Sequence, residues 1–314
     1  MDKALLAVII AALSAVVVFQ IVQARRLGKL LRRARRSLLI GPEAHLRLQK
    51  QVFDRLAAQE CAARSITPRL PVEFRSEWGE DVLLYELFWP QNSGVYIEAG
   101  ALDGRTQSVT WLFEALGWSG LLVEPIPERC EECRRNRPGS VVVHAALGGP
   151  DATGTTSFMV PANPEHQFSA HREHEGMGRQ HLEALQRSGA VMRRVDVPLS
   201  SLNTELERAG FAGVDFASID VEGGELDVIK GFDLAKFRVR VLVVEDLSHG
   251  TDDAVAARIQ GLGYEQVCWI GANRVFVRRD EPELLRRARR LAETVYSPFV
   301  RPPGHPDSAP RALR

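Results

Sequence analysis

Four acidic side chains stand at or beside the ends of short apolar runs: Glu98, Glu124, Asp220 and Glu245. Each run has the length and the β-branched composition of a buried strand. In an open parallel sheet the carboxyl ends of the strands meet at one edge, where ligands bind at the switch in strand order. Four acids gathered there suit a cationic or polyhydroxyl ligand. The alternative for any single acid is that it only caps the helix after its strand.

A loop with two glycines follows the first of these strands and reads Glu98-Ala-Gly100-Ala-Leu-Asp103-Gly104. Glycine lets the backbone turn tightly and lets a ligand approach where a Cβ would collide. The Gly-x-x-x-Gly spacing differs from the Gly-x-Gly-x-x-Gly of a pyrophosphate-binding loop. Glu124, at the end of the next strand, is placed to accept hydrogen bonds from ribose hydroxyls. Together these features favour an adenosine ligand without a diphosphate, of which S-adenosylmethionine is the common example.

The elements that must position these residues alternate between strand and helix. Alternation of this kind predicts an α/β fold in which helices cover both faces of a parallel sheet. Residues 72–295 are long enough for one such domain. The predicted strands are 94–98, 120–124, 140–145, 214–220, 239–245 and a terminal pair at 264–269 and 274–278, and the predicted helices between them include 107–116, 128–135 and 225–229.

Five short motifs follow one another between Ser76 and Glu245, over about half of the chain. They are Ser76-Glu-Trp-Gly79-Glu80-Asp81, Tyr96-Ile-Glu98-Ala-Gly100-Ala-x-Asp103-Gly104, Gly117-Trp118-x-Gly120-x-x-x-Glu124-Pro125, Ala145-Ala-Leu-Gly148 and Ser218-Ile-Asp220-Val-Glu222-Gly223-x-Glu225. In this order the motifs resemble those of FkbM-like class I methyltransferases. Glu98 departs from the pattern, because such families often have Asp at that position.

The resemblance implies a Rossmann-like class I methyltransferase domain with a mostly parallel, seven-stranded sheet that binds S-adenosylmethionine. It implies that Glu98, Gly100 and Gly104 surround the methionine part of the cofactor and that Glu124 binds the ribose. The complete set of cofactor-binding residues that it implies is Glu98, Gly100, Asp103, Gly104, Glu124, Pro125, Ala145, Ala146 and Asp220.

The resemblance also implies where the adenine ring binds. Ala145 and Ala146 would lie near the ring, and the side chain of Leu147 or Ile126 would pack on it. Acidic walls suit this cofactor because its sulfonium is a cation.

Asp220 and Glu222 are implied to face the transferred methyl group or the acceptor. Methyl transfer to an alcohol is an in-line displacement in which the acceptor oxygen must also lose a proton. Asp220 is the first candidate for the base and His249 the second, whereas Glu225 is interpreted as a helix first-turn acid. We predict no metal site. Carboxylates at Asp220, Glu222 and Glu245 would nevertheless also suit Mg²⁺, and the sequence leaves base and ligand open.

The interval 151–195 is predicted to be an insertion that serves as an acceptor-binding lid. Residues 155–160 and 191–197 have the pattern of a strand pair on either side of a polar segment. The histidines of this segment match no zinc spacing, and its Arg and His side chains suit an acidic acceptor or a merely solvated surface. These histidines are His166, His171, His174 and His181.

An uncharged stretch of 19 residues, Ala4–Val22, predicts a transmembrane anchor within residues 1–24. Such a helix spans roughly 28 Å, close to the thickness of the hydrocarbon core. A cleaved signal peptide is the alternative, but its apolar run would be shorter and its basic residues would precede the run. Residues 1–36 carry a net charge of +7, which favours a cytoplasmic C-terminal side. The sequence therefore predicts a single-pass membrane protein whose catalytic domain faces the cytoplasm.

The segments around the domain are predicted to be simple in structure. Residues 25–71 form basic juxtamembrane and stem helices, one of them from about residue 43 to residue 64. Residues 296–314, with five prolines, form a disordered tail. The four cysteines, including the lone pair Cys130-x-x-Cys133, are predicted to be reduced.

The sequence as a whole predicts an S-adenosylmethionine-dependent methyltransferase that methylates a hydroxyl of a small molecule, a glycan or a lipid-linked acceptor at the membrane. The 40 basic and 40 acidic residues give a net charge of zero and no sign of a nucleic-acid partner. Two alternatives stay open. One is a non-catalytic membrane adaptor with the same fold, and the other is a nicotinamide-dependent oxidoreductase, which the missing pyrophosphate loop disfavours.

Overall fold

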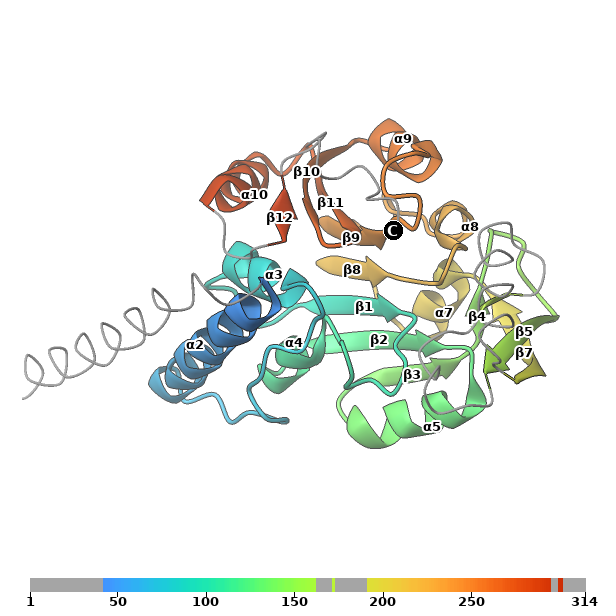
Figure 1. Ribbon diagram of the computed structural model, residues 1–314, viewed down its shortest axis with the longest axis horizontal. Helices are drawn as coiled ribbons and strands as arrows, with labels where there is room; N and C mark the ends of the chain where they lie inside the picture. The colour runs from blue at the N-terminus through green and yellow to red at the C-terminus, as the bar shows by residue number, and fades with distance from the viewer. Residues whose placement is uncertain (1–41, 162–170, 173–190, 295–298, 302–314) are drawn as a thin grey trace, which may run out of the picture.

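An eight-stranded sheet forms the centre of the protein in a computed structural model that describes residues 42–161, 171–172, 191–294 and 299–301. Five neighbouring strands run parallel, and β11 and β12 are antiparallel to the strands beside them. From one edge to the other the strands are β12 (Val300–Arg301), β10 (Tyr264–Ile270), β11 (Asn273–Arg278), β9 (Val241–Glu245), β8 (Phe216–Ile219), β1 (Val95–Ala99), β2 (Ser119–Glu124) and β3 (Val141–His144) (Figure 1).

Alternate residues of the central strands enter two separate cores, because successive side chains of a strand point to opposite faces. Tyr96 and Phe216 belong to one core, and their neighbours Ile97 and Ala217 belong to the other. All four side chains are completely buried. The sheet is therefore covered on both faces, as the alternation of strands and helices predicts.

Different helices cover the two faces. The first core contains side chains of α2 (Pro42–Ala63), α3 (Glu80–Phe88), α4 (Trp111–Ala115), α5 (Pro127–Asn136) and α10 (Pro282–Thr294). The second contains side chains of α7 (Leu202–Arg208), α8 (Glu225–Lys230) and α9 (Ala254–Gly261).

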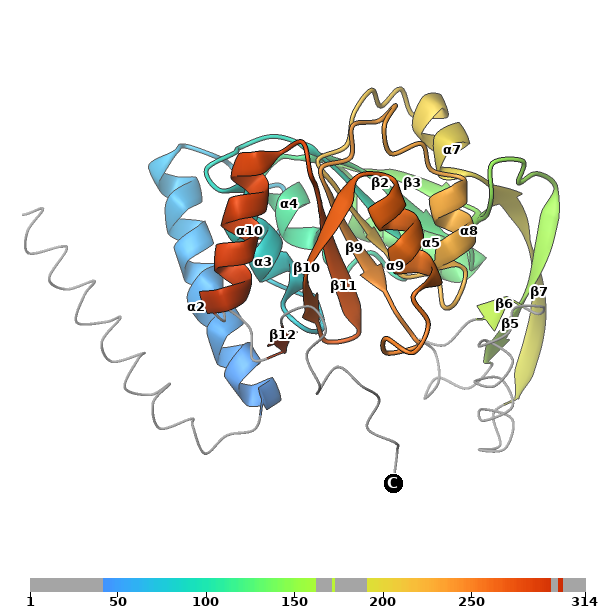
Figure 2. The ribbon, with the colours of Figure 1, turned by 90° about the horizontal axis from the view of Figure 1, so that it is seen from above.

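A smaller four-stranded sheet stands beyond the carboxyl ends of the parallel strands, at the end of the molecule opposite to α2 and α10 (Figures 1 and 2). β5 pairs with β7 along the whole length of β5, which confirms the strand pair predicted at the two ends of the insertion. The strands of this smaller sheet are, in order, β4 (Ala146–Leu147), β7 (Met192–Ser200), β5 (Thr155–Pro161) and β6 (His171–Arg172).

The stem helix predicted from about residue 43 to residue 64 is confirmed as α2, and its Phe53 and Ala57 pack into the first core. The predicted anchor, residues 1–24, lies outside the described residues, and so does the predicted tail, residues 296–314, apart from residues 299–301. Within that short piece Val300 and Arg301 form an edge strand, so the prediction of a disordered tail is wrong for these two residues, which pair with β10. Within the ranges that the structure describes, no helix is both long and apolar enough to cross a membrane.

Two details differ from the predicted architecture. The sheet has eight strands instead of seven, because Val300–Arg301 adds a two-residue edge strand beside β10. The helix predicted at 107–116 covers only Trp111–Ala115. The residues before it cannot be helical, because Gln107 has a φ of 57° and the Val109 N–H donates to the Glu98 carboxylate.

Candidate functional site

Two adjoining cavities lie at the carboxyl ends of the parallel strands. The larger cavity has a volume of about 200 Å³, and the second, which we call the acidic cavity, has a volume of about 80 Å³. Four residues line both cavities: Gly100, Leu102, Gln107 and Asp220. A single elongated ligand can therefore extend from one cavity into the other across the end of β1.

Gly100, the residue after β1, lies against the backbone of Asp220, the residue after β8. Its φ is 87°, and a Cβ added there would lie 1.8 Å from the carbonyl oxygen of Asp220. Any other residue would collide with the backbone of the neighbouring strand. The structure confirms the tight turn predicted at this glycine, but the group that a Cβ would meet is the backbone at Asp220 and not a ligand.

Glu124 ends β2 in the wall of the larger cavity, as its predicted ribose role requires. Its Oε2 accepts the Leu102 N–H and its Oε1 accepts the Ile126 N–H, both at 2.9 Å. Burial raises its pKa to about 7, although both hydrogen bonds and nearby Arg129 oppose the shift. Each carboxylate oxygen has a second lone pair, so the fixed side chain can still accept a bond from a ligand hydroxyl.

The rest of the larger cavity has an apolar wall next to the Glu124 side chain. Pro125, Ala145 and Ala146 line it, as predicted. Leu147 also lines it, whereas Ile126 is buried beside Phe158 in a separate small core. Leu147 is therefore the member of the predicted pair that can pack on a ring in this cavity.

Glu98 lines the acidic cavity, but its carboxylate is also fully engaged with the protein. It accepts hydrogen bonds from the Ser108 hydroxyl at 2.8 Å, the Val109 N–H at 2.7 Å and the Thr110 hydroxyl at 2.6 Å. It therefore holds the loop before α4 in place, and that loop forms one wall of the acidic cavity.

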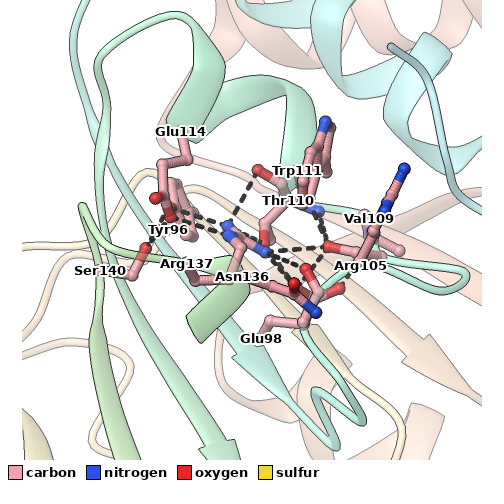
Figure 3. A network of polar contacts seen from close by, with 12 residues as sticks. Tyr96, Glu98, Arg105, Val109, Thr110, Trp111, Glu114, Asn136, Arg137 and Ser140 are labelled. Carbon is pink, nitrogen blue, oxygen red and sulfur yellow. Dashed lines mark hydrogen bonds and ion pairs between the residues drawn. The ribbon is translucent and has the colours of Figure 1, made fainter. Parts of the chain in front are cut away.

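Arg137 is the cation at the centre of this network (Figure 3). Its guanidinium has no exposed surface and donates to Glu114 at 2.8 Å and to the Gly104 carbonyl at 3.0 Å, with Glu98 at 3.4 Å. Burial by itself would lower the pKa of Arg137, but Tyr96 and the two carboxylates raise it overall. Through Arg137 the network therefore fixes Glu98, near the end of β1, and the loop that contains Gly104 relative to each other.

The acidic cavity takes its name from five carboxyl groups in its wall. Among its lining residues in the described ranges there is no lysine, arginine or histidine. Asp220 reaches solvent through the cavity even though protein encloses it on most sides, and that enclosure raises its pKa. The five acids are Glu77, Glu80, Glu98, Asp220 and Glu245.

Glu80 and Glu245 form the floor of the acidic cavity next to β11. The Asn273 amide donates to Glu80 Oε1 at 2.6 Å, and Asn273 pairs in register with Glu245. Burial raises the pKa of Glu80 to about 7 and raises that of Glu245 well above its usual range. These acids are therefore held in a region where negative charge is costly without a cation.

The two acids that follow β8 differ in role. Glu222 lines the larger cavity with a φ of 59°, and burial together with Asp220 raises its pKa to about 8. Glu225 is buried, and its Oε1 accepts the N–H groups of Val221 and Gly223 at 3.0 and 3.1 Å. Glu225 thus fixes the loop that carries Glu222, which agrees with its place in the first turn of α8.

Three of the proposed site residues lie outside both cavities. Asp103 accepts the N–H groups of the following loop, and a Cβ at Gly104 would meet Cys133 and Arg137. His249 is exposed, because Asp246 folds the chain after β9 into a tight turn that directs it away. The structure thus does not bring His249 to Asp220, and Glu245 occupies the neighbouring position instead.

The cysteines are free and buried, which agrees with the prediction that they are reduced. Burial raises the pKa of the thiols of Cys61, Cys130, Cys133 and Cys268, so none has the character of a reactive thiolate. His171 lies in β6, and His166, His174 and His181 lie outside the described residues.

The larger cavity also contains residues that the sequence analysis did not identify: Gln107, Leu102, Arg129 and Phe158. Gln107 and Leu102 both have positive φ values, which no motif in the chain reveals. Arg129 follows the Glu124-Pro125 motif by one helical turn, so its position at the start of α5 was a usable signal. Phe158 comes from the insertion and could be placed only by the pairing of β5 with β7.

The strand order and the paired cavities define a class I, Rossmann-like methyltransferase. From β3 to β10 the order is β3-β2-β1-β8-β9-β11-β10, with only β11 antiparallel within it. Residues 98–265 match the Methyltransferase FkbM domain. The chain therefore belongs to the FkbM methyltransferase family, which confirms the resemblance and makes it an S-adenosylmethionine-dependent methyltransferase by family and fold.

Three solved structures are similar to this chain at low identity. A TehB-like SAM-dependent methyltransferase from Corynebacterium glutamicum has 11% identity, a TM-score of 0.38, and coverage of 73% of this chain and 99% of its own. An O-methyltransferase from Bacillus cereus in complex with SAH has 14% identity, a TM-score of 0.35, and coverage of 72% of this chain and 90% of its own. Aeropyrum pernix fibrillarin with natively bound S-adenosyl-L-methionine has 13% identity, a TM-score of 0.35, and coverage of 65% of this chain and 74% of its own. None of the curated proteins matches the sequence.

Proposed function

We propose that this protein transfers the methyl group of S-adenosylmethionine to a hydroxyl oxygen of a sugar, a glycan or a lipid-linked acceptor. The observation that carries the proposal is the junction of the two cavities at Gly100 and Asp220. On one side of this junction is the larger cavity, with its apolar wall and its fixed acid, Glu124. On the other side is a cavity lined by carboxylates, which suits the positive end of this cofactor.

The cofactor is proposed to lie across the end of β1. Its ribose hydroxyls donate to Glu124, and its adenine packs between Leu147 and the side of Ala145 and Ala146. Its methionine part passes Gly100, which lines both cavities, and reaches the acidic cavity. The sulfonium then stands next to Asp220, the one carboxylate that both cavities share.

The reaction needs alignment and a proton acceptor. The acceptor oxygen attacks the methyl carbon, the carbon–sulfur bond breaks, and S-adenosylhomocysteine leaves as a neutral thioether. The hydroxyl proton passes to Asp220, which is solvent-accessible in the cavity and has an elevated pKa. An elevated pKa suits a general base that works near neutral pH. Most of the rate would come from holding oxygen, carbon and sulfur in line.

The charge of the acidic cavity bears on the acceptor class. Its described lining contains Glu77 and Glu80 in addition to Asp220 and no basic side chain, so it supplies hydrogen-bond acceptors and repels anions. A neutral polyhydroxyl compound donates hydrogen bonds to such a wall through its own hydroxyls. This favours a sugar hydroxyl over a carboxylate or phosphate as the methylated group.

We further propose that the enzyme is a single-pass membrane protein with its catalytic domain in the cytoplasm, which rests on the apolar stretch Ala4–Val22 and the net charge of +7 over residues 1–36. A reporter enzyme fused after Arg36 tests the orientation. Activity of a cytoplasmic reporter and silence of an export-dependent reporter are expected. The opposite result would show that the chain after Arg36 is translocated.

The central test is calorimetric titration of the full chain with S-adenosylmethionine, S-adenosylhomocysteine and NAD⁺. Saturable binding of the first two and none of NAD⁺ is expected. If neither sulfur compound bound at millimolar concentration, the proposed function would be wrong. Transfer of a labelled methyl group to a panel of sugar and lipid-linked alcohols separates an active enzyme from a non-catalytic adaptor, which would bind the cofactor without turnover.

A further inference from the structure

Three carboxylates from different elements converge beneath the junction of the two cavities. Asp220 follows β8, Glu225 begins α8 and Glu245 ends β9. Each contributes an oxygen, and these oxygens all lie within 4.8 Å of one another. The convergence follows from the fold, because β8 and β9 are adjacent parallel strands whose carboxyl ends meet at this edge.

One oxygen of this group has no partner. Glu245 Oε2 is inaccessible to solvent and accepts no hydrogen bond from the described part of the chain, and protein encloses nearly all of its carboxyl group. The Asp220 carboxylate lies close enough to share a hydrogen bond with it. Two ionised carboxylates have no hydrogen to share, so either a proton or another cation such as a metal ion must lie between them.

The neighbouring charged groups do not supply that cation. Arg137 is engaged with Glu98 and Glu114, and Arg274 forms ion pairs with Asp246 and Asp253.

The other charged groups that face this site are mostly acids. Glu222 stands near it on the loop before α8, and Glu77 and Glu80 face it across the acidic cavity. Arg129 is the nearest remaining cation, and it interacts with Glu124 and Glu222 on the side of the larger cavity. The site between Asp220, Glu225 and Glu245 is therefore strongly negative and has no protein counter-charge among the residues described.

We propose that Asp220, Glu225 and Glu245 bind a divalent cation of the Mg²⁺ or Mn²⁺ type. All three ligands offer oxygen, which hard divalent ions prefer. Metal–oxygen bonds of about 2.1 Å in an octahedron place neighbouring oxygens about 3.0 Å and opposite oxygens about 4.2 Å apart. Both separations fit within the 4.8 Å limit that the three oxygens satisfy. Water and an acceptor oxygen entering from the acidic cavity would complete the coordination, and Asp220 would bind the ion through one oxygen and keep the other for the acceptor proton.

This proposal differs from the prediction from the sequence, which placed no metal here and left Asp220, Glu222 and Glu245 open as ligands of one. Glu222 has its side chain in the wall of the larger cavity and is outside the group, and Glu225 takes its place. A shared proton is the competing occupant. It would join Asp220 to Glu245 and leave Glu225 with only its two backbone hydrogen bonds, whereas a divalent ion serves all three carboxylates.

Mn²⁺ binding to the full chain, followed by electron paramagnetic resonance after removal of metals with EDTA, tests the site. We expect one saturable site that Mg²⁺ displaces. Asp220→Asn and Glu245→Gln each remove one ligand charge and should weaken binding at least about tenfold. Glu222→Gln is the matched control, since it neutralises an acid two residues from Asp220 and should change affinity less than about threefold. Affinity should fall with decreasing pH, because protons compete for the same oxygens.

The result separates this inference from the proposed function, because the metal site does not require the cofactor. S-adenosylhomocysteine binding and thermal melting of each variant show whether it is folded. If the folded wild-type chain bound S-adenosylhomocysteine but no Mn²⁺, the carboxylates would share a proton and the metal site would be refuted while the function stood. Binding of Mn²⁺ that survived both Asp220→Asn and Glu245→Gln would also refute it. If Mn²⁺ bound at these residues but the chain bound neither S-adenosylmethionine nor S-adenosylhomocysteine, the metal site would stand and the proposed function would be refuted.

Discussion

Replacing Arg137 by methionine should destabilise the protein strongly. The side chain has no exposed surface, and it lies between two carboxylates, Glu98 and Glu114, that are almost equally buried. Methionine fills a similar volume but leaves both acids without their cation. Breaking a buried ion pair by removing one partner costs about 3–5 kcal/mol, because a charge stays buried and uncompensated. We therefore expect Arg137→Met to lower the free energy of unfolding by about 4 kcal/mol at neutral pH.

Urea denaturation of the full chain, followed by tryptophan fluorescence, measures this change without adding salt that would screen the charges. Arg134→Met is the matched control. Arg134 lies one turn earlier on α5, is exposed and pairs with the exposed Glu131, so its loss should cost less than about 0.5 kcal/mol. Equal effects of the two substitutions would refute the role given to the buried network.

The same variant has a defined dependence on pH. Burial alone would raise the pKa of Glu114, but Arg137 and hydrogen bonds hold it below its ordinary value of 4.5. A carboxyl group with a lowered folded pKa stabilises the protein above its unfolded pKa and loses that contribution as pH falls through the folded pKa. The difference between wild type and Arg137→Met should thus be largest above about pH 5 and shrink in acid. A constant difference would contradict the electrostatic explanation.

Three further predictions concern the cofactor site. Glu124→Ala should weaken S-adenosylmethionine binding by about 1–3 kcal/mol through lost hydrogen bonds, and an unchanged dissociation constant in calorimetry would exclude the ribose role. Because burial raises the pKa of Glu124 to about 7, protonation should weaken cofactor binding progressively below that pH, and a flat profile would contradict this. Gly100→Ala should lower the melting temperature and abolish cofactor binding, since its Cβ would lie 1.8 Å from the Asp220 carbonyl oxygen. A variant that stayed stable and still bound the cofactor would contradict this, because it would show that the two strand ends separate easily.

Much of the fold was predictable because its signals are local. The strands that end at Glu98, Glu124 and Glu245 are apolar runs of fixed length, and each was located to within about two residues. The edge strand Val300–Arg301 has two residues and no periodicity, so the sequence could not reveal it. Its existence depends on the tertiary position of β10.

The site was predictable only in part, because side-chain partners far apart in sequence decide where a carboxylate points. Glu98 was predicted to contact the cofactor. Its carboxylate, however, accepts hydrogen bonds from residues 108–110 and from Arg137, so the protein itself uses most of its hydrogen-bonding capacity. His249 follows Glu245 closely in the chain, yet a turn stabilised by Asp246 directs it to solvent. Chain proximity was therefore a poor guide to spatial proximity at this position.

The packing of β5 has a consequence for how such an enzyme can diverge. Phe158 and Val160 point into a small core shared with Ala146, and Phe158 also lines the larger cavity. Ser157 and Met159 alternate with them and lie on the opposite face of the strand. Replacing Phe158 would therefore alter the small core and the wall of the larger cavity together, whereas replacing Ser157 or Met159 would alter neither. Two neighbouring positions of one strand thus differ in whether a substitution can reach the cavity at all.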